Sequence, residues 1–129
     1  MSEKFPVEII TPEKTVLQLE ASEVTIPSFE GEMGILKDHI PLITFLRPGF
    51  IFIKSDENKK YYIEEGTVEF SNNNLLILTS SVKDVGEIDK QSIKNLLDEA
   101  EKKIKENDLS DKEKYIISYK IDALKNISL

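Results

Sequence analysis

The stretch from Ile26 to Gly49 reads IPSFEGEMGILKDHIPLITFLRPG, and it concentrates the residues that constrain a protein backbone. It holds three of the five glycines, three of the five prolines, the only arginine (Arg47) and the only histidine (His39). Glycine and proline fix backbone geometries that other residues adopt with difficulty. We therefore expect this stretch to follow a dictated path, with polar groups at defined points along it.

Composition narrows the class of protein. The chain has 129 residues, 40% of them hydrophobic, which is enough for one domain or a small domain with an appendage. Its net charge of −7 and the lack of a basic cluster disfavour nucleic acid as a partner. It has no cysteine, no apolar run of the roughly 20 residues that span a bilayer, and no signal-peptide pattern at its start. Composition alone predicts a soluble intracellular chain.

The chain divides at Gly86, after which there is neither glycine nor proline. Residues 1–86 contain short runs rich in Val, Ile, Phe and Tyr, separated by turn-like breaks at Ser55–Asn58, Glu65–Gly66 and Ser71–Asn74. Strands that recur every 8–12 residues are typical of a β-sandwich or barrel. The predicted strands contain Phe5–Ile9, Val24–Ile26, Phe50–Lys54, Tyr61–Ile63, Val68–Phe70 and Leu75–Leu78.

Residues 87–129 predict two amphipathic helices. Asp89 suits the N-cap of the first, and Ser110 with Glu113 forms a capping box for the second. Apolar stripes run along the two helices at Ile93, Leu96, Leu97, Ala100 and Ile104, and at Ile117, Ile121 and Leu124. A short break between such helices predicts an antiparallel hairpin that needs a partner surface. The sequence thus indicates an α+β chain with a β-sandwich over 1–86 and a helical hairpin over 87–129.

Candidate chemistry gathers in the central stretch, where Glu30, Glu32, Asp38 and His39 are close in sequence. Two carboxylates and an imidazole can act as acid and base or bind a metal, but no motif with either spacing is present. His39 suits either a loop residue bonded to the local backbone or a partner contact. The glycines that flank Glu32-Met33 predict a turn rather than a phosphate loop. The lysines after Gly86 alternate with acids and predict a solvated face.

The central motifs closely resemble the ε subunit of F-type ATP synthases, which is called δ in mitochondria. The likeness lies in EGE-x-GIL from Glu30, in the run from His39 through Pro41 to Thr44, and in the basic residue before Pro48-Gly49. It covers the whole chain in length and order. The resemblance implies a flattened antiparallel β-sandwich of about ten strands followed by a helix–loop–helix.

The resemblance also implies a role. Members of this family are non-catalytic rotor subunits that bind the γ subunit, sit on the c-ring, help couple proton flow to ATP synthesis, and touch the α and β subunits transiently. The residues that the resemblance places at the c-ring and γ contacts are Glu32, Asp38, His39, Ile40, Pro41, Leu42 and Thr44. It further implies peripheral attachment, through protein partners, to the cytoplasmic face of a bacterial inner membrane.

Two departures from the family pattern matter. Asp38 and Ile40 replace a glycine and an alanine, so we expect Asp38 to meet a basic group on the c-ring. Some bacterial members bind ATP through Ile/Leu-Asp-x-x-Arg-Ala on the first helix, where this chain has Ser92 in place of the arginine. Serine cannot replace the bidentate phosphate contacts of arginine, so we expect no cofactor and no useful ATP binding.

The sequence leaves other functions open. The main alternative is a free-standing protein-binding module on the same fold, and a weak enzyme built on Glu30, Glu32 and His39 is a third. Whether the hairpin inhibits ATP hydrolysis is also open. Deletion of Gln91–Leu129 would decide that question, because an unchanged ATPase rate of the reconstituted complex would exclude such a brake.

Overall fold

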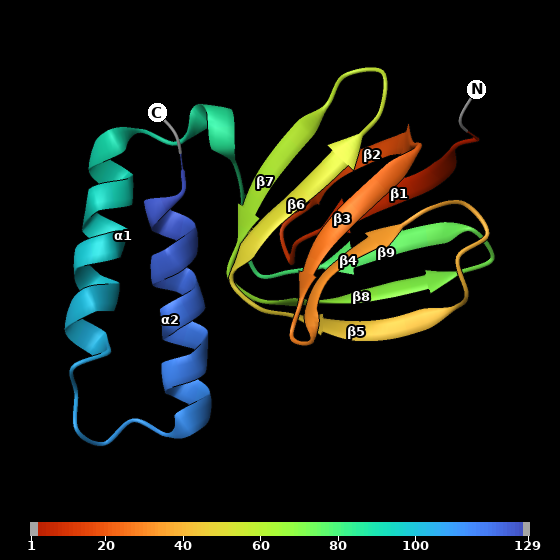
Figure 1. Cartoon of the computed structure of the whole chain (residues 1–129). Coiled ribbons are helices and arrows are strands. Elements are labelled where there is room, and N and C mark those ends of the chain that lie inside the picture. The colour runs from red at the N-terminus through yellow and green to blue at the C-terminus, as the bar shows by residue number, and fades with distance from the viewer. Residues whose placement is uncertain (1–2, 128–129) are drawn as a thin grey trace.

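The computed structural model describes residues 3–127, which form a curled β-sheet with a helical hairpin at one end (Figure 1). The strands are β1 Phe5–Ile10, β2 Thr15–Ala21, β3 Glu23–Ser28, β4 Gly31–Ile35, β5 Leu42–Leu46, β6 Gly49–Lys54, β7 Lys59–Ile63, β8 Gly66–Ser71, β9 Asn74–Leu78 and β10 Val82–Asp84. A 3-10 turn, Val85–Glu87, leads to helices α1 Lys90–Lys103 and α2 Asp111–Lys125. The α+β fold predicted from the sequence is confirmed. The division of the chain into folding units at Gly86 stays a prediction.

The sheet folds over into two layers. Its strand order is β10-β7-β6-β3-β5-β8-β9-β1-β2, with β4 paired to β3. The layers meet where Ser28 of β3 pairs with Leu46 of β5. The strand pairs are antiparallel except that β1 and β9 are parallel, a departure from the purely antiparallel expectation. Parallel neighbours require a long connection, and here strands β2 to β8 supply it.

Four strands, β2, β4, β5 and β10, are not among those predicted individually from the sequence. The prediction of a turn at Gly31 and Gly34 is wrong, because both glycines lie in β4, which pairs with β3 from Ser28↔Gly31 to Val24↔Ile35. The turn itself is only Phe29–Glu30. Glycine weakens local strand propensity, so tertiary pairing decides the structure of β4.

The core lies between the two layers. Alternate residues of each strand point inward, as the period of two requires. The rings of Phe5 and Phe70 meet edge to face in this core, with centroids 5.6 Å apart. Its fully buried aliphatic members include Ile9, Ile26, Ile35, Ile51, Ile53, Ile63, Leu75 and Ile77.

The hairpin has the predicted caps. The Asp89 carboxylate accepts from the Ser92 N–H at 2.7 Å, and Ser110 and Glu113 form both bonds of the capping box. Helix α2 lies between α1 and the sheet (Figure 1). The end of the hairpin nearest the sheet packs in a second apolar cluster made of Tyr62, Ile93, Ala123, Leu124 and Ile127. This cluster is the partner surface that the narrow apolar stripes require.

The helix caps predict an acid-sensitive hairpin. Hydrogen bonds from the Ser92 and Ser110 backbones hold the pKa of Asp89 and of Glu113 below their ordinary values of 3.8 and 4.5. A lowered pKa in the folded state stabilises the helices above these values, and that stability is lost as the pH falls through the folded pKa. The helical circular dichroism signal should therefore weaken as the pH falls below these ordinary pKa values. Asp89→Asn, which keeps the cap acceptor without the charge, should shift the loss to lower pH. Identical titrations of the two proteins would contradict the assignment.

Neither helix within residues 3–127 is long and apolar enough to cross a membrane.

Candidate partner-binding surfaces

Glu32 lies at the end of the sheet that faces the hairpin. It is exposed on β4 and is paired in register with Pro27, whose carbonyl accepts from the Arg47 N–H at 3.0 Å. Glu32, Arg47 and Tyr119 of α2 line one small hollow. The acidic residue of the central motif therefore sits beside the hairpin.

His39 lies at the opposite end of the sheet, in the loop between β4 and β5. Its N–H donates to the Leu36 carbonyl at 3.1 Å, and its Nδ1 lies 2.8 Å from the Ile40 carbonyl oxygen. Its ring meets the edge of Phe70 with centroids 6.0 Å apart, which leaves the residue half-buried rather than exposed. The reading of His39 as a loop residue bonded to the local backbone agrees with this geometry. Its role as a partner contact stays a prediction.

Asp38 has a structural role that the sequence did not reveal. Its φ is +68°, in the left-handed region that favours glycine, which fits the glycine of the family pattern. Its N–H donates to Asn73 Oδ1 at 2.7 Å, and Asn73 Nδ2 donates to Asp38 Oδ1 at 3.0 Å. This reciprocal pair ties the loop of His39 to the turn between β8 and β9.

The reciprocal pair leads to a stability prediction. Asp38→Gly relieves the left-handed strain but loses one hydrogen bond, so the free energy of unfolding should change by less than about 1 kcal/mol. Asp38→Ala loses the bond and keeps the strain, and it should cost about 1–2 kcal/mol. Denaturant unfolding of the two variants checks this. An alanine variant as stable as the glycine variant would contradict it.

The sequence-predicted contact residues thus fall into two groups. Asp38 to Leu42 lie in the far loop and at the start of β5, whereas Glu32 lies at the hairpin end. Thr44 lies further along β5 and lines a cleft that faces α2. Leu42 packs against the core. The carboxylates and the imidazole of the catalytic alternative do not converge on one point, and residues 3–127 contain no group of three potential metal ligands.

Strand β5 exposes two large apolar side chains that were not among the predicted site residues. Ile43 is 75% exposed and Phe45 is 61% exposed. Phe45 pairs across the sheet with Thr67, which pairs with Leu78, itself 43% exposed. These side chains form an outward apolar face, defined here as Ile43, Phe45 and Leu78. Every residue of β5 except Thr44 is apolar, so its sequence does not indicate which side faces out.

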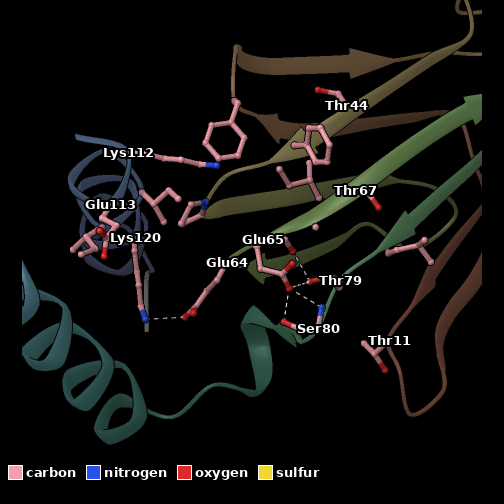
Figure 2. A pocket seen from close by; sticks show the side chains of 18 of the residues that line it. Thr11, Thr44, Glu64, Glu65, Thr67, Thr79, Ser80, Lys112, Glu113 and Lys120 are labelled. Atoms are coloured by element: carbon pink, nitrogen blue, oxygen red, sulfur yellow. Dashed lines mark hydrogen bonds and ion pairs between the residues drawn. The ribbon is translucent and has the colours of Figure 1, made fainter. Parts of the chain in front are cut away.

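A cleft of about 1460 Å³ separates this face from the hairpin (Figure 2). Phe45 and Leu78 line it on the sheet side, and Ile116 and Ile117 line it on the α2 side. Four of its acidic or basic lining residues are Glu30, Glu99, Lys103 and Lys112. The cleft therefore has apolar walls with charges of both signs around them.

Glu64 and Lys120 bridge the sheet and α2 beside the cleft (Figure 2). Lys120 Nζ lies 3.3 Å from Glu64 Oε2, and both side chains are largely covered. The same oxygen accepts from the Tyr62 hydroxyl at 3.1 Å. Burial, and then the Glu64 carboxylate, raise the pKa of Tyr62 above its ordinary range. Lys120 is therefore an exception to the predicted solvated lysine face.

Glu65 joins the ends of β8 and β9. Its Oε1 accepts from the Ser80 N–H at 2.7 Å and from the Ser80 hydroxyl, and its carbonyl accepts from Thr79 Oγ1 at 2.6 Å (Figure 2). These bonds fix the chain where it leaves β9 toward β10. The Glu65 carboxylate therefore has a structural role.

Comparisons with known proteins agree on one family. Residues 4–85 match the family model described as ATP synthase, Delta/Epsilon chain, beta-sandwich domain. The chain is 53% identical to an ATP synthase epsilon chain of Pelagibacter ubique, over 99% of this chain and 100% of that relative. It is 34% identical to an ATP synthase epsilon chain of Hydrogenobaculum, over 76% of this chain and 72% of the relative.

Two solved structures share the fold. One is a chain of the Euglena gracilis mitochondrial ATP synthase OSCP/F1/c-ring structure, with a TM-score of 0.78 and 22% identity over 95% of this chain and 79% of that one. The other is from the central stalk and c-ring of the Tetrahymena thermophila mitochondrial ATP synthase, with a TM-score of 0.66, 17% identity and 96% coverage of both chains.

Proposed function

The chain belongs to the ATP synthase delta/epsilon family, and from that premise we propose that it is a non-catalytic rotor subunit of a proton-translocating F-type ATP synthase. Its relatives are named ATP synthase epsilon chains, so the chain is an accessory subunit of an enzyme complex. In the proposed role it binds the γ subunit and the c-ring, turns with both, and helps couple proton flow to ATP synthesis.

The observation that carries the proposal is the outward apolar face. Ile43 and Phe45 leave most of their surface in water, and apolar groups clustered with Leu78 in this way mark a surface for a partner. A γ subunit seated on this face would cover them. Ile40, which is 73% exposed, continues the apolar surface into the loop of His39. We therefore assign the loop from Asp38 to Pro41 and the outward side chains of β5 to the γ contact, in place of the c-ring contact expected for Asp38. Leu42 and Thr44 alternate with Ile43 and Phe45 along β5 and point to its other side, so their part in the contact stays a prediction.

Glu32 then belongs to a separate contact. It lies at the hairpin end of the sheet, away from His39, and it is exposed. We assign Glu32 to the c-ring contact, where its carboxylate would meet polar or basic groups. In a bacterium these two contacts would hold the chain at the cytoplasmic face of the inner membrane. Contacts of the hairpin with the α and β subunits would be transient.

Co-purification tests the proposed role against a free-standing binding module. A tagged chain expressed in its source organism should bring down the γ subunit and, in mild detergent, the c-ring. Recovery of the chain without γ would refute the rotor role. The weak-enzyme alternative predicts a different outcome, in which alanine at Glu30, Glu32 and His39 abolishes a small-molecule turnover without loss of γ.

We also predict that the isolated chain does not bind ATP usefully. Ser92 stands where the ATP-binding pattern has arginine, residues 87–129 contain no arginine, and the Asp89 carboxylate is already engaged as a helix cap. No guanidinium of the hairpin is therefore available for phosphate. Isothermal titration should show no saturable binding at submillimolar ATP. Saturable binding in that range would contradict the prediction. Ser92→Arg provides a variant that restores the motif's charge.

A further inference from the structure

The only arginine of the chain joins the sheet to the hairpin. Arg47 follows β5, and its Nη1 donates to the Tyr115 hydroxyl oxygen at 2.9 Å. Its guanidinium carbon lies 3.8 Å from the centroid of the Tyr119 ring. One planar side chain thus makes a hydrogen bond to one tyrosine of α2 and stacks on another.

Tyr115 completes the contact on the other side. Its hydroxyl donates to the Phe29 carbonyl at 2.7 Å, so the oxygen both accepts and donates. Its ring stacks on Phe29 with centroids 5.7 Å apart and planes 13° from parallel. The Tyr115 and Tyr119 rings lie 4.8 Å apart. We call Phe29, Arg47, Tyr115 and Tyr119 the arginine clip.

The sheet side of the clip is firmly anchored. Phe29 and Arg47 follow β3 and β5, the two strands where the layers join. The Phe29 N–H donates to the Phe45 carbonyl at 3.1 Å, and the Arg47 N–H donates to the Pro27 carbonyl at 3.0 Å. The clip therefore acts between a fixed base and the hairpin.

The clip contacts α2 far from the apolar cluster that holds the end of the hairpin, so it can fix the angle of the helix. The apolar cluster that holds the hairpin contains Leu124 and Ile127, close to the connection from β10. Tyr115 lies nine residues earlier than Leu124, or roughly 13 Å along the helix at 1.5 Å per residue. Between Tyr115 and the outward apolar face the cleft, rather than a packed core, separates α2 from the sheet. The clip thus bridges a gap at some distance from the hinge.

We propose that Arg47 is the positioning residue that fixes the angle of the hairpin against the sandwich and so keeps the cleft at its present width. The inference goes beyond the proposed rotor role, because it concerns the posture of the hairpin in the chain alone. Without the clip, the cluster of Tyr62, Leu124 and Ile127 still holds the hinge end. The tip, around residues 104–109, is then free to move away from the sheet.

The lack of cysteine allows a direct test on the full chain. Spin labels on cysteines introduced at Asn58, in the β6–β7 loop, and at Lys105, near the hairpin tip, occupy exposed positions. Pulsed electron–electron double resonance then measures the distance between the hairpin tip and the sheet. The otherwise unchanged chain should give one narrow distribution. Arg47→Met should broaden it about twofold or more and add a longer distance, with unchanged far-UV circular dichroism.

Lys60→Met is the matched control. Its ammonium stacks on Phe50 at 4.4 Å and on Phe52 at 5.1 Å, so the variant removes another cation–aromatic contact within the sheet. Its distance distribution should stay narrow. If Arg47→Met does not fold, Tyr115→Phe decides, because it removes both hydrogen bonds of the hydroxyl and keeps the ring. A narrow, unshifted distribution in the folded Arg47 variant, or in the Tyr115 variant, would overturn the proposal.

Discussion

Aspartate at both Ile43 and Phe45 should weaken binding of the γ subunit by about 30-fold or more. The few hot-spot residues at the centre of an interface cost at least about 2 kcal/mol when truncated, and a carboxylate would add the cost of burying a charge. Because the two side chains are 75% and 61% exposed in the free chain, its stability should hardly change. Titration of purified γ with each protein measures the effect.

The control for this prediction is Phe52→Asp. Phe52 is a partly exposed aromatic residue, 39% exposed, on β6 of the other layer. The variant adds one negative charge, against two in the double variant, and should keep the affinity for γ. Equal affinity of the double variant and the unchanged chain would remove the outward apolar face from the γ contact.

Replacement of Gly66 by alanine should destabilise the fold by roughly 2–4 kcal/mol, with a fall in melting temperature of roughly 8–15 °C. Gly66 begins β8 with a φ of +156°, a backbone conformation that residues other than glycine rarely adopt. A Cβ there would lie 2.5 Å from the Leu78 carbonyl oxygen and 3.3 Å from Leu46 Cδ1. The backbone of β9 would have to move.

Gly34→Ala is the matched control for Gly66. Gly34 also lies in a strand, but the nearest atom to its Cβ would be Glu23 Oε2, at 3.5 Å and on a flexible side chain. Its stability should change by less than about 1 kcal/mol. If thermal unfolding gave the same midpoint for both variants, the close approach of β8 and β9 at Gly66 would be wrong.

Local chemistry made the helical part predictable. The cap residue Asp89 and the capping box of Ser110 and Glu113 act through neighbours three residues away, so the sequence itself contains the whole interaction. The same holds for strands with clear alternation such as β1 and β6. The Gly-rich β4 and the short β10 lack a local signal, because their partners β3 and β7 determine their structure.

The candidate surfaces were less predictable, because they depend on long-range pairing. Glu32 and His39 are seven positions apart, yet β4 runs between them and places them at opposite ends of the sheet. Strand β5 has apolar residues on both sides, so only its register with β8 separates outward Ile43 and Phe45 from inward Leu42 and Leu46. The partner of Arg47 lies 68 residues away on α2, and no sequence pattern links them.

Disulfide trapping in the assembled enzyme tests the rotor role most directly. A cysteine at Ile43, the only one in that variant, can be paired with a facing cysteine on γ, and a cysteine at Lys105 near the hairpin tip can be paired with one on α or β, the stationary partners. We predict that the bond to γ forms in high yield and leaves ATP synthesis intact, because two parts of one rotor stay fixed to each other. A bond to α or β should stop synthesis. Loss of ATP synthesis when the chain is locked to γ would contradict the proposed rotor role.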